Sequence, residues 1–177
     1  MKIAIFGYSG AGKSTLAKIL SEHYHCQTLF LDQVRFMPGW KERDKTEARQ
    51  IVQRFLNENQ SWVIEGNYPS FCQEERLEQA DQIICLKFNR FTCFRRAYRR
   101  FCSNEGQVRD SMAPGCEEKF DFEFAKWILR DGRNRKCRRY YRAIIHQYPQ
   151  KTKVLKNQRQ VDAYLSALGI QPHRCKP

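Results

Sequence analysis

The sequence predicts an α/β fold with a five-stranded parallel sheet and helices on both of its faces. Short apolar, β-prone runs alternate along the chain with segments whose apolar residues recur at helical spacing. A glycine-rich loop joins the first strand to the first helix, and 177 residues suffice to bury one core of ordinary size. Such alternation is typical of a three-layer parallel sheet that binds ligands at the C-terminal ends of its strands.

Each element is expected from composition and periodicity. The expected strands cover residues 2–6, 27–31, 61–65, 82–88 and 152–155. The expected helices cover residues 13–24, 46–59, 74–79, 91–102 and 161–168, with two more between Lys119 and His146 that break near Asp131 and Gly132. Residues 103–118 lack periodicity and indicate a loop, and residues 171–177 indicate a frayed tail. We expect one domain over residues 1–177, with a lid or insertion at about residues 103–135.

The chain is strongly basic, with a net charge of +13 and a pI near 9.6. Residues 90–142 alone hold twelve Arg and three Lys against seven acidic residues. This balance suits phosphate-rich partners, and it fits a nucleotide or a nucleic acid backbone equally well.

Cysteine usage and the N-terminus both indicate a cytoplasmic protein. The eight cysteines include no C-x-x-C pair, which favours reduced thiols over a disulfide framework or a zinc site. The first apolar run is about five residues long, far short of the roughly 20 that a membrane span needs. We therefore expect no interaction with a membrane.

The chemistry is concentrated in the run Gly7-Tyr8-Ser9-Gly10-Ala11-Gly12-Lys13-Ser14, which matches G-x-x-x-x-G-K-[ST] at every fixed position. Glycines let the backbone N–H groups of such a P-loop surround phosphates, the lysine reaches the outer phosphates, and the serine hydroxyl binds magnesium. The motif predicts that ATP or GTP binds with Mg²⁺. The expected nucleotide-binding residues are Gly7, Ser9, Gly10, Ala11, Gly12, Lys13, Ser14 and Thr15.

Two carboxylates follow apolar strands and are candidates for work at the phosphates. Glu65 ends the run Trp62-Val63-Ile64, and we predict that it binds magnesium together with Ser14. Asp32 follows Leu29-Phe30-Leu31 and is expected either to face the metal or to act as a base on a phosphoryl acceptor. The alternative for each is a helix cap or a solvated turn residue.

Arginines are expected to neutralise the migrating phosphoryl group. Arg96 and Arg100 are four residues apart and share one face of a basic helix, while Arg130 and Arg133 flank the predicted break and could close as a lid. With Lys13 and Asp32, these four complete the expected catalytic set. The alternative is that these arginines are solvated surface charges. A further group on the next helix could bind a nucleic acid or form a solvated face, and it comprises Arg135, Arg138, Arg139 and Arg142.

Several aromatic residues lie near these positions. Trp40 and Tyr68 lie in strand-end loops and are expected to line an acceptor pocket. Phe120, Phe124 and Trp127 recur at helical spacing and are expected in the core rather than stacked on bases.

Six segments together resemble the bacterial DNA topology modulation proteins, the FlaR-type group of P-loop proteins, over nearly the whole chain. These segments are GYSGAGKST, LDQVRFMPGW, SWVIEGNY, ADQIICLKFNRFTCFRRAYRR, KFDFEFAKWILRDGR and VLKNQRQVDAYL. That group is similar in fold to adenylate kinase and shikimate kinase. The resemblance implies a nucleotide-kinase-like core, an acceptor-binding segment after the second strand and an arginine-bearing lid.

The resemblance also implies roles for particular residues. Glu65-Gly66 stands where adenylate kinases carry Asp-Gly, and Arg96 and Arg100 stand where they carry two arginines that enter the lid. Asp32 matches an acceptor-contacting carboxylate of shikimate kinase, although Val34 replaces that family's second aspartate.

Together these observations predict an ATP-dependent phosphotransferase that acts on a small-molecule or nucleotide acceptor. The alternative is a nucleic-acid-associated ATP-binding protein that affects DNA topology, with the nucleotide as a switch. A third reading is an ATP-binding regulator of protein partners that does not turn over nucleotide.

Overall fold

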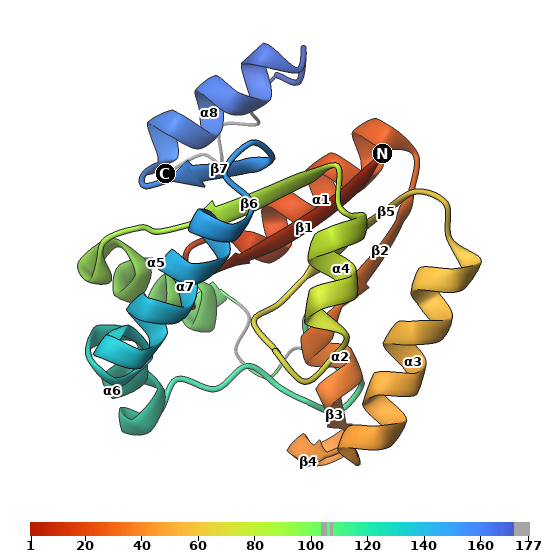
Figure 1. Cartoon of the computed structure of the whole chain (residues 1–177). Helices are drawn as coiled ribbons and strands as arrows, with labels where there is room; N and C mark the ends of the chain where they lie inside the picture. The colour runs from red at the N-terminus through yellow and green to blue at the C-terminus, as the bar shows by residue number, and fades with distance from the viewer. Residues whose placement is uncertain (104–105, 107, 172–177) are drawn as a thin grey trace.

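A parallel sheet of five strands forms the centre of the protein, which is described by a computed structural model over residues 1–103, 106 and 108–171 (Figure 1). The strand order is β2-β5-β1-β6-β7. The predicted α/β class and five-stranded sheet are confirmed. The strands are β1 (Lys2–Gly7), β2 (Gln27–Phe30), β5 (Trp62–Glu65), β6 (Gln82–Leu86) and β7 (Thr152–Leu155).

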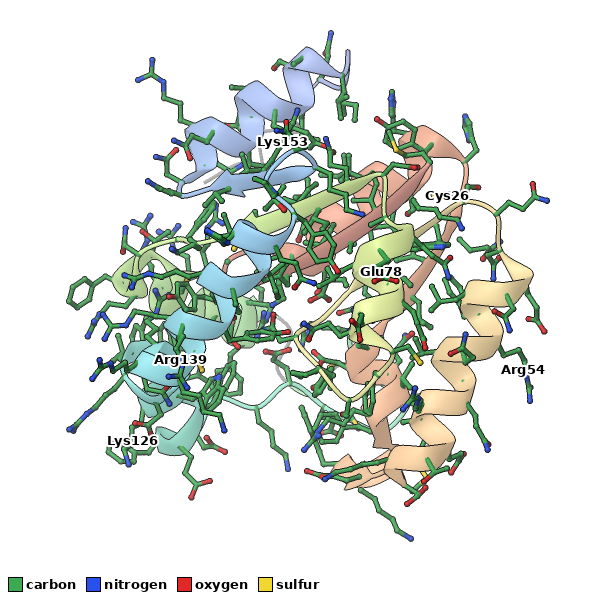
Figure 2. The ribbon with its side chains drawn as sticks, viewed as in Figure 1. Cys26, Arg54, Glu78, Lys126, Arg139 and Lys153 are labelled. Carbon is green, nitrogen blue, oxygen red and sulfur yellow. The ribbon has the colours of Figure 1, made fainter. Side chains whose placement is uncertain are left out.

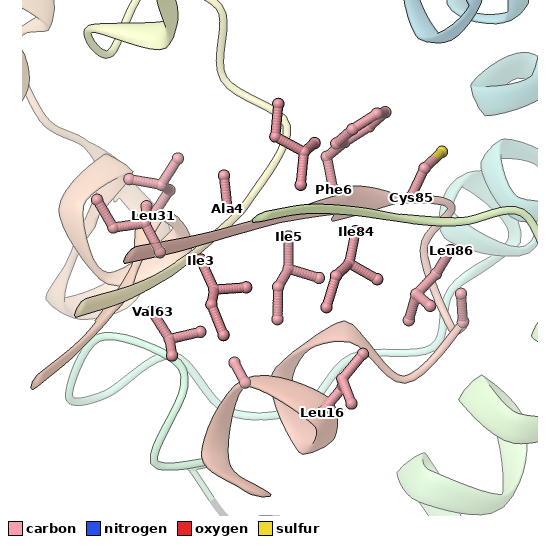
Figure 3. Packing of buried hydrophobic residues seen from close by; sticks show 14 of the residues in the cluster. Ile3, Ala4, Ile5, Phe6, Leu16, Leu31, Val63, Ile84, Cys85 and Leu86 are labelled. Carbon is pink, nitrogen blue, oxygen red and sulfur yellow. The ribbon is translucent and has the colours of Figure 1, made fainter. Parts of the chain in front are cut away.

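Apart from polar residues at their ends, the central strands β1, β5 and β6 are apolar because both faces of the sheet are covered. Figure 3 shows Ile3, Ile5 and Ile84 directed toward the face that carries Leu16 of helix α1 (Lys13–Tyr24). Phe6 is directed to the opposite face, where Tyr141 of α7 (Arg135–Gln147) packs against it at 5.3 Å between ring centroids. The alternation of side chains along β1 therefore binds one helix to each face.

Other helices complete the two outer layers. Figure 1 shows α4 and α7 in front of the sheet, α1 behind it and α8 beside β7. Asp44 caps α3 by accepting hydrogen bonds from the backbone of Thr46 and Glu47. The remaining helices are α3 (Lys45–Glu58), α4 (Gln73–Gln79), α5 (Arg90–Ser103), α6 (Phe122–Leu129) and α8 (Gln158–Ala167).

The chain departs from the expected pattern after the second strand. β2 ends at Phe30, and Asp32 lies in the first turn of the short helix α2 (Leu31–Arg35), so its expected place at a strand end is wrong. Leu31, at the start of this helix, is fully buried against Gly66, where a β-carbon would lie 2.6 Å from that of Leu31. A small antiparallel pair that was not predicted follows: β3 (Phe36–Met37) and β4 (Lys41–Glu42), joined by the 3₁₀ turn η1 (Pro38–Trp40).

The predicted break between the two helices of residues 119–146 is confirmed. The 3₁₀ turn η2 (Asp131–Arg133) separates α6 from α7, and a β-carbon on Gly132 would lie 2.9 Å from the Trp127 ring. Within the expected loop, residues 104, 105 and 107 lie outside the described residues, as do 172–177 of the expected tail. Val108 and Glu117 form an antiparallel bridge.

Two further observations concern membranes and thiols. Within the described residues, every helix is too short or too polar to cross a bilayer. The seven cysteines in that part of the chain are free.

Candidate functional site

The P-loop, residues 7–14, connects β1 to α1 and lies tightly against two neighbouring elements. A β-carbon on Gly7 would come within 2.3 Å of the Leu86 carbonyl oxygen, and one on Gly10 within 2.4 Å of the Cys93 carbonyl oxygen. Both glycines also have positive φ, of 144° and 76°. Only glycine fits these two positions. The loop therefore packs closely against the last residue of β6 and the first turn of α5.

The first turn of α1 is arranged to hold an anion. Gly12 occupies the N-cap with φ of 94° and offers no capping side chain, so the first N–H groups of the helix remain available to a ligand. Lys13, Ser14 and Thr15 follow in the first turn, and all three line one pocket. A loop that excludes side chains, followed by an uncapped helix start and a lysine, fits the phosphates of a nucleotide.

Glu65 is the buried carboxylate that Lys13 and Ser14 share. The Lys13 Nζ lies 3.5 Å from Glu65 Oε1, and the Ser14 hydroxyl donates a hydrogen bond of 3.0 Å to Oε2. Burial raises the pKa of Glu65, and Asp32 adds to the rise, while Lys13 and the Ser14 hydrogen bond oppose it. Lys13 and Ser14 therefore favour the charged form of this carboxylate, whereas its burial disfavours that form.

The oxygens of Ser14 and Glu65 also suit Mg²⁺. Magnesium prefers hard oxygen ligands and is usually held by one or two carboxylates together with water and substrate phosphates. Across the described stretches of the chain, no group of three or more His, Cys, Asp or Glu residues has metal-binding geometry. A magnesium ion held by Ser14 and Glu65 would take its remaining ligands from phosphate and water.

Asn67 fixes the start of the P-loop. Its side-chain oxygen accepts a hydrogen bond of 3.0 Å from the Gly7 N–H, and its amide nitrogen donates one of 2.8 Å to the Gly7 carbonyl. These two bonds join the end of β5 to the end of β1 and place Glu65 beside the loop. The sequence analysis missed this role, because an asparagine after a Glu-Gly pair is also a common turn residue.

Asp32 lines the same pocket as the P-loop residues, together with Tyr68. The Tyr68 hydroxyl donates a hydrogen bond of 2.6 Å to Asp32 Oδ1, and its ring stacks on Phe71 at 5.0 Å. Burial raises the pKa of Tyr68 strongly, and Asp32 raises it further. The phenol therefore stays a donor, and it directs one carboxylate oxygen of Asp32.

Residues of the P-loop line one pocket of about 850 Å³ together with Glu65, Asp32 and Tyr68. Phe36 and Trp40 line it near Asp32, with their rings 5.3 Å apart, and the buried indole N–H of Trp40 has no hydrogen-bond partner among the described residues. Phe124 and Trp127 line it as well. Phe120 and Phe124 pack against the core as predicted, whereas Trp127 is 47% exposed, so its predicted place in the core is wrong. A donor and an acceptor could thus occupy the pocket together.

Residues 108–118, called the strap below, cross this pocket. Asp110 forms an ion pair with Lys18 of α1, and its carbonyl accepts a hydrogen bond from Gln33 of α2. The Gly115 carbonyl accepts a hydrogen bond of 3.3 Å from Gly39. Figure 1 shows this segment passing β3 and β4 on its way to α6.

Two arginines meet in the pocket wall. Arg100 of α5 donates from Nε and Nη2 to Glu118 Oε1 at 2.8 and 2.6 Å, and Arg109 of the strap pairs with the other oxygen of Glu118. Glu118 is 7% exposed, yet all three side chains line the pocket. Sequence reasoning missed Arg109 and Glu118, because residues 103–118 have no periodicity that would indicate burial.

The other expected arginines do not line the large pocket. Arg96 contacts the P-loop from outside the pocket. It donates a hydrogen bond of 3.2 Å to the Ala11 carbonyl, and its guanidinium lies 4.8 Å from the centroid of the Phe88 ring. Arg133 donates a hydrogen bond of 2.9 Å to the Phe88 carbonyl, and its guanidinium carbon lies 3.8 Å from the centroid of the Tyr8 ring. Arg130 is exposed at the end of α6. Gly7 and Ala11 lie in the loop without lining the pocket, whereas Ser9, Gly10 and Gly12 line it.

A phosphate-binding loop at the end of a central parallel strand, beside a buried carboxylate on the next strand, defines a P-loop nucleotide-binding protein. A family model described as ABC transporter matches residues 1–174, and the chain belongs to this family. A comparison with curated proteins gives no match. These findings do not test the resemblance to DNA topology modulation proteins, which stays a prediction.

Solved structures of kinases share the fold. A shikimate kinase from Acinetobacter baumannii, in complex with shikimate, is 16% identical with a TM-score of 0.54, over 94% of this chain and 93% of that one. A shikimate kinase from Bacteroides thetaiotaomicron is 16% identical with a TM-score of 0.52, over 95% of each chain. A gluconokinase from Sinorhizobium meliloti 1021 is 16% identical with a TM-score of 0.50, over 95% of this chain and 91% of that one. At such identities the likeness establishes the fold alone.

Proposed function

We propose that the protein is a magnesium-dependent phosphotransferase that moves the terminal phosphoryl group of ATP, or of GTP, to a small-molecule or nucleotide acceptor. One observation carries this proposal: the P-loop residues Lys13 and Ser14 and the pair Asp32–Tyr68 line the same pocket. Such a pocket brings donor and acceptor together, as a transferase requires. The kinase folds found in the comparison are consistent with it.

Each residue has a definite task under this proposal. Gly10, Gly12 and the start of α1 hold the phosphates through backbone N–H groups, and Thr15 adds a hydroxyl near them. Ser14 and Glu65 hold the magnesium ion, which neutralises phosphate charge when bound. Lys13 and Arg100 offset the charge that develops on the transferred group.

Asp32 receives the proton of the acceptor hydroxyl. Its position supports this role because one oxygen already accepts from Tyr68, which leaves the other free to face an acceptor in the pocket. Catalytic roles for Arg96, Arg130 and Arg133, and a lid over residues 103–135 of a single domain, stay predictions.

The first experiment is nucleotide turnover by the full chain and by Lys13→Ala, with ATP, GTP and Mg²⁺. Nucleoside monophosphates, small hydroxyl compounds and duplex DNA serve as acceptors or effectors. Lys153→Ala is the control, since Lys153 lies exposed on β7 away from the pocket (Figure 2). We expect acceptor-dependent ADP release that falls at least about a hundredfold in Lys13→Ala alone. Hydrolysis that no acceptor stimulates would contradict a transferase and indicate an ATPase instead.

The basic helices favour the second candidate, nucleic-acid association with the nucleotide as a switch. The sequence of α7 holds five Arg or Lys residues and no Asp or Glu, and Figure 2 shows its Arg139 at the surface. Contacts with backbone phosphates make binding fall steeply with salt. Polynucleotide binding that weakens in an Arg135→Ala, Arg138→Ala, Arg139→Ala triple variant would support this candidate, and salt-independent or absent binding would exclude it.

A further inference from the structure

A buried arginine on α4 contacts the backbone of Tyr68. Arg76 is 3% exposed. Its Nε donates a hydrogen bond of 2.7 Å to the Phe71 carbonyl, and its Nη2 donates one of 2.9 Å to the Tyr68 carbonyl. Burial lowers the pKa of Arg76 to about 10, so the guanidinium stays charged at neutral pH. Both hydrogen bonds are therefore charge-assisted, and such bonds are roughly twice as strong as neutral ones.

Arg76 holds both ends of the turn from Tyr68 to Phe71. The Phe71 N–H donates a hydrogen bond of 3.3 Å to the Tyr68 carbonyl. Pro69 and Ser70, the central residues of this turn, are exposed. The bond from Arg76 to the Tyr68 carbonyl is shorter than the bond within the turn. The backbone position of Tyr68 therefore depends on Arg76.

The Tyr68 side chain connects this turn to the carboxylate of Asp32. The loop between β5 and α4 passes α2 (Figure 1), and the Tyr68 hydroxyl donates its 2.6 Å hydrogen bond to Asp32 there. The ring stacks on Phe71, and the guanidinium carbon of Arg35 lies 5.2 Å from its centroid. Among these described residues, Asp32 and Tyr68 line the pocket and Arg76 does not. Any effect of Arg76 on the pocket is therefore exerted through Tyr68.

The residues just before this turn have anchors of their own. The Gly66 N–H donates a hydrogen bond of 3.0 Å to the Ile5 carbonyl. Asn67 makes its two hydrogen bonds, of 3.0 and 2.8 Å, with Gly7 of the P-loop. The loop after β5 is thus held by β1 and the P-loop at its first two residues, and by Arg76 of α4 at the turn that follows.

We propose that Arg76 is a positioning residue for the acceptor carboxylate: it holds Tyr68 where the phenol can direct Asp32. The inference rests on the proposed phosphotransferase function and adds a residue that lies outside the pocket. Its consequence is selective. Loss of Arg76 should impair use of the acceptor and leave nucleotide binding unchanged, because Gly66 and Asn67 keep their own hydrogen bonds to β1 and the P-loop.

Chemical denaturation of the full chain tests the structural step without nucleotide or acceptor. A double-mutant cycle combines Tyr68→Phe with Arg76→Met, which removes the guanidinium donors and keeps a side chain of similar shape. Arg76→Lys, which keeps the charge and one donor group, is the second variant and decides alone if Arg76→Met does not fold. The matched control is Arg54→Met, at an exposed position of α3 (Figure 2).

We expect Tyr68→Phe to shift the unfolding equilibrium of the wild-type chain at least about tenfold, the size of a lost hydrogen bond to a charged group. In Arg76→Met the same change should shift it less than about threefold, because the hydroxyl is no longer aimed at Asp32. Arg76→Lys should give an intermediate shift, and Arg54→Met should keep the full one. An equal shift in all these backgrounds would overturn the inference, whatever reaction the protein catalyses.

Steady-state kinetics tests the functional step, with an acceptor found in the turnover screen. We expect kcat/KM for the acceptor to fall about tenfold in Arg76→Met and by less in Arg76→Lys, while KM for Mg²⁺–ATP stays within about twofold of wild type. Adding Tyr68→Phe to Arg76→Met should cost little more. Arg54→Met should behave as wild type.

The opposing outcomes of the kinetic test are distinct. Equal losses for acceptor and nucleotide would indicate a merely structural role, which would overturn this inference and leave the proposed function standing. A wild-type chain that transfers no phosphoryl group would overturn the proposed function, and with it the role of Arg76 toward an acceptor. The denaturation cycle distinguishes that result from a failure of Arg76 to hold Tyr68.

Discussion

Ser14 and Glu65, 51 residues apart in the sequence, are joined by a hydrogen bond of 3.0 Å. The bond links the first turn of α1 to the last residue of β5. Lys13 approaches the other oxygen of the same carboxylate at 3.5 Å. The P-loop lysine and serine are therefore both oriented toward a single buried acid, and the first prediction concerns that acid.

Glu65→Gln should change the pH dependence of stability. Burial raises the folded-state pKa of Glu65 above its unfolded value, so its contribution to stability is full below about pH 4 and is lost as pH rises through the folded-state pKa. An uncharged glutamine removes that loss. We expect the difference in Tm between Glu65→Gln and wild type to be more favourable to the variant at pH 8 than at pH 4. Each kcal/mol of unfolding free energy corresponds to about 2–4 °C in Tm.

Thermal unfolding of ligand-free protein at both pH values measures this effect. Glu58→Gln, an exposed change at the end of α3, is the control. Equal shifts at the two pH values would show that Glu65 is not the group that titrates.

Magnesium-dependent turnover should fall at least about tenfold in Glu65→Gln, through the loss of one ligand.

Gly10→Ala should abolish nucleotide binding. Its φ of 76° is costly for alanine, and its β-carbon would also lie 2.4 Å from the Cys93 carbonyl oxygen. Gly169 has φ of 77° with open space around it, so Gly169→Ala isolates the backbone cost, about 1–2 kcal/mol. Chemical denaturation should show a larger loss for Gly10→Ala than for Gly169→Ala. Equal losses would mean that the loop can move away from α5.

Tyr68→Phe should weaken the acceptor end of the pocket alone. It removes the 2.6 Å hydrogen bond to Asp32 and keeps the stacked ring. A lost hydrogen bond to a charged group corresponds to about 1.5–3 kcal/mol, so kcat/KM for the acceptor should fall about tenfold or more. KM for Mg²⁺–ATP should not change. Steady-state kinetics measures both parameters, with Tyr24→Phe at the far end of α1 as the control variant. A change in KM for Mg²⁺–ATP without a change in kcat/KM for the acceptor would refute this prediction.

Arg133→Ala should destabilise the P-loop, whereas Arg130→Ala should have little effect. Arg133 donates to the Ile128 and Phe88 carbonyls and covers Tyr8, while Arg130 is exposed. We expect a loss of about 2–4 kcal/mol for Arg133→Ala, little rescue by Arg133→Lys, and less than about 0.5 kcal/mol for Arg130→Ala. Denaturant unfolding measures each. If Arg133→Ala keeps full stability but loses turnover, Arg133 acts on the phosphates as the sequence predicts.

Much of the fold could be predicted because its signals are local. Apolar runs of strand length, helical periodicity and the eight-residue P-loop pattern each lie within a few neighbouring residues. The boundaries of β1, α1 and β7 agree with expectation to within one residue. The turn into α2 was missed because Leu31 extends the apolar run of β2, and its close packing on Gly66 joins residues far apart in the chain.

By itself, the sequence determined the α/β class, the P-loop and the identity of Glu65 as the carboxylate at the end of a strand. Only the tertiary structure decided that Asn67 clamps Gly7, that Arg96 and Arg133 contact the loop from outside, and that Glu118 joins Arg100 to Arg109. Periodicity tells which face of an element is buried, but not which charge on another segment will meet it. Those pairings form between residues distant in the chain, and the packing of the elements selects them.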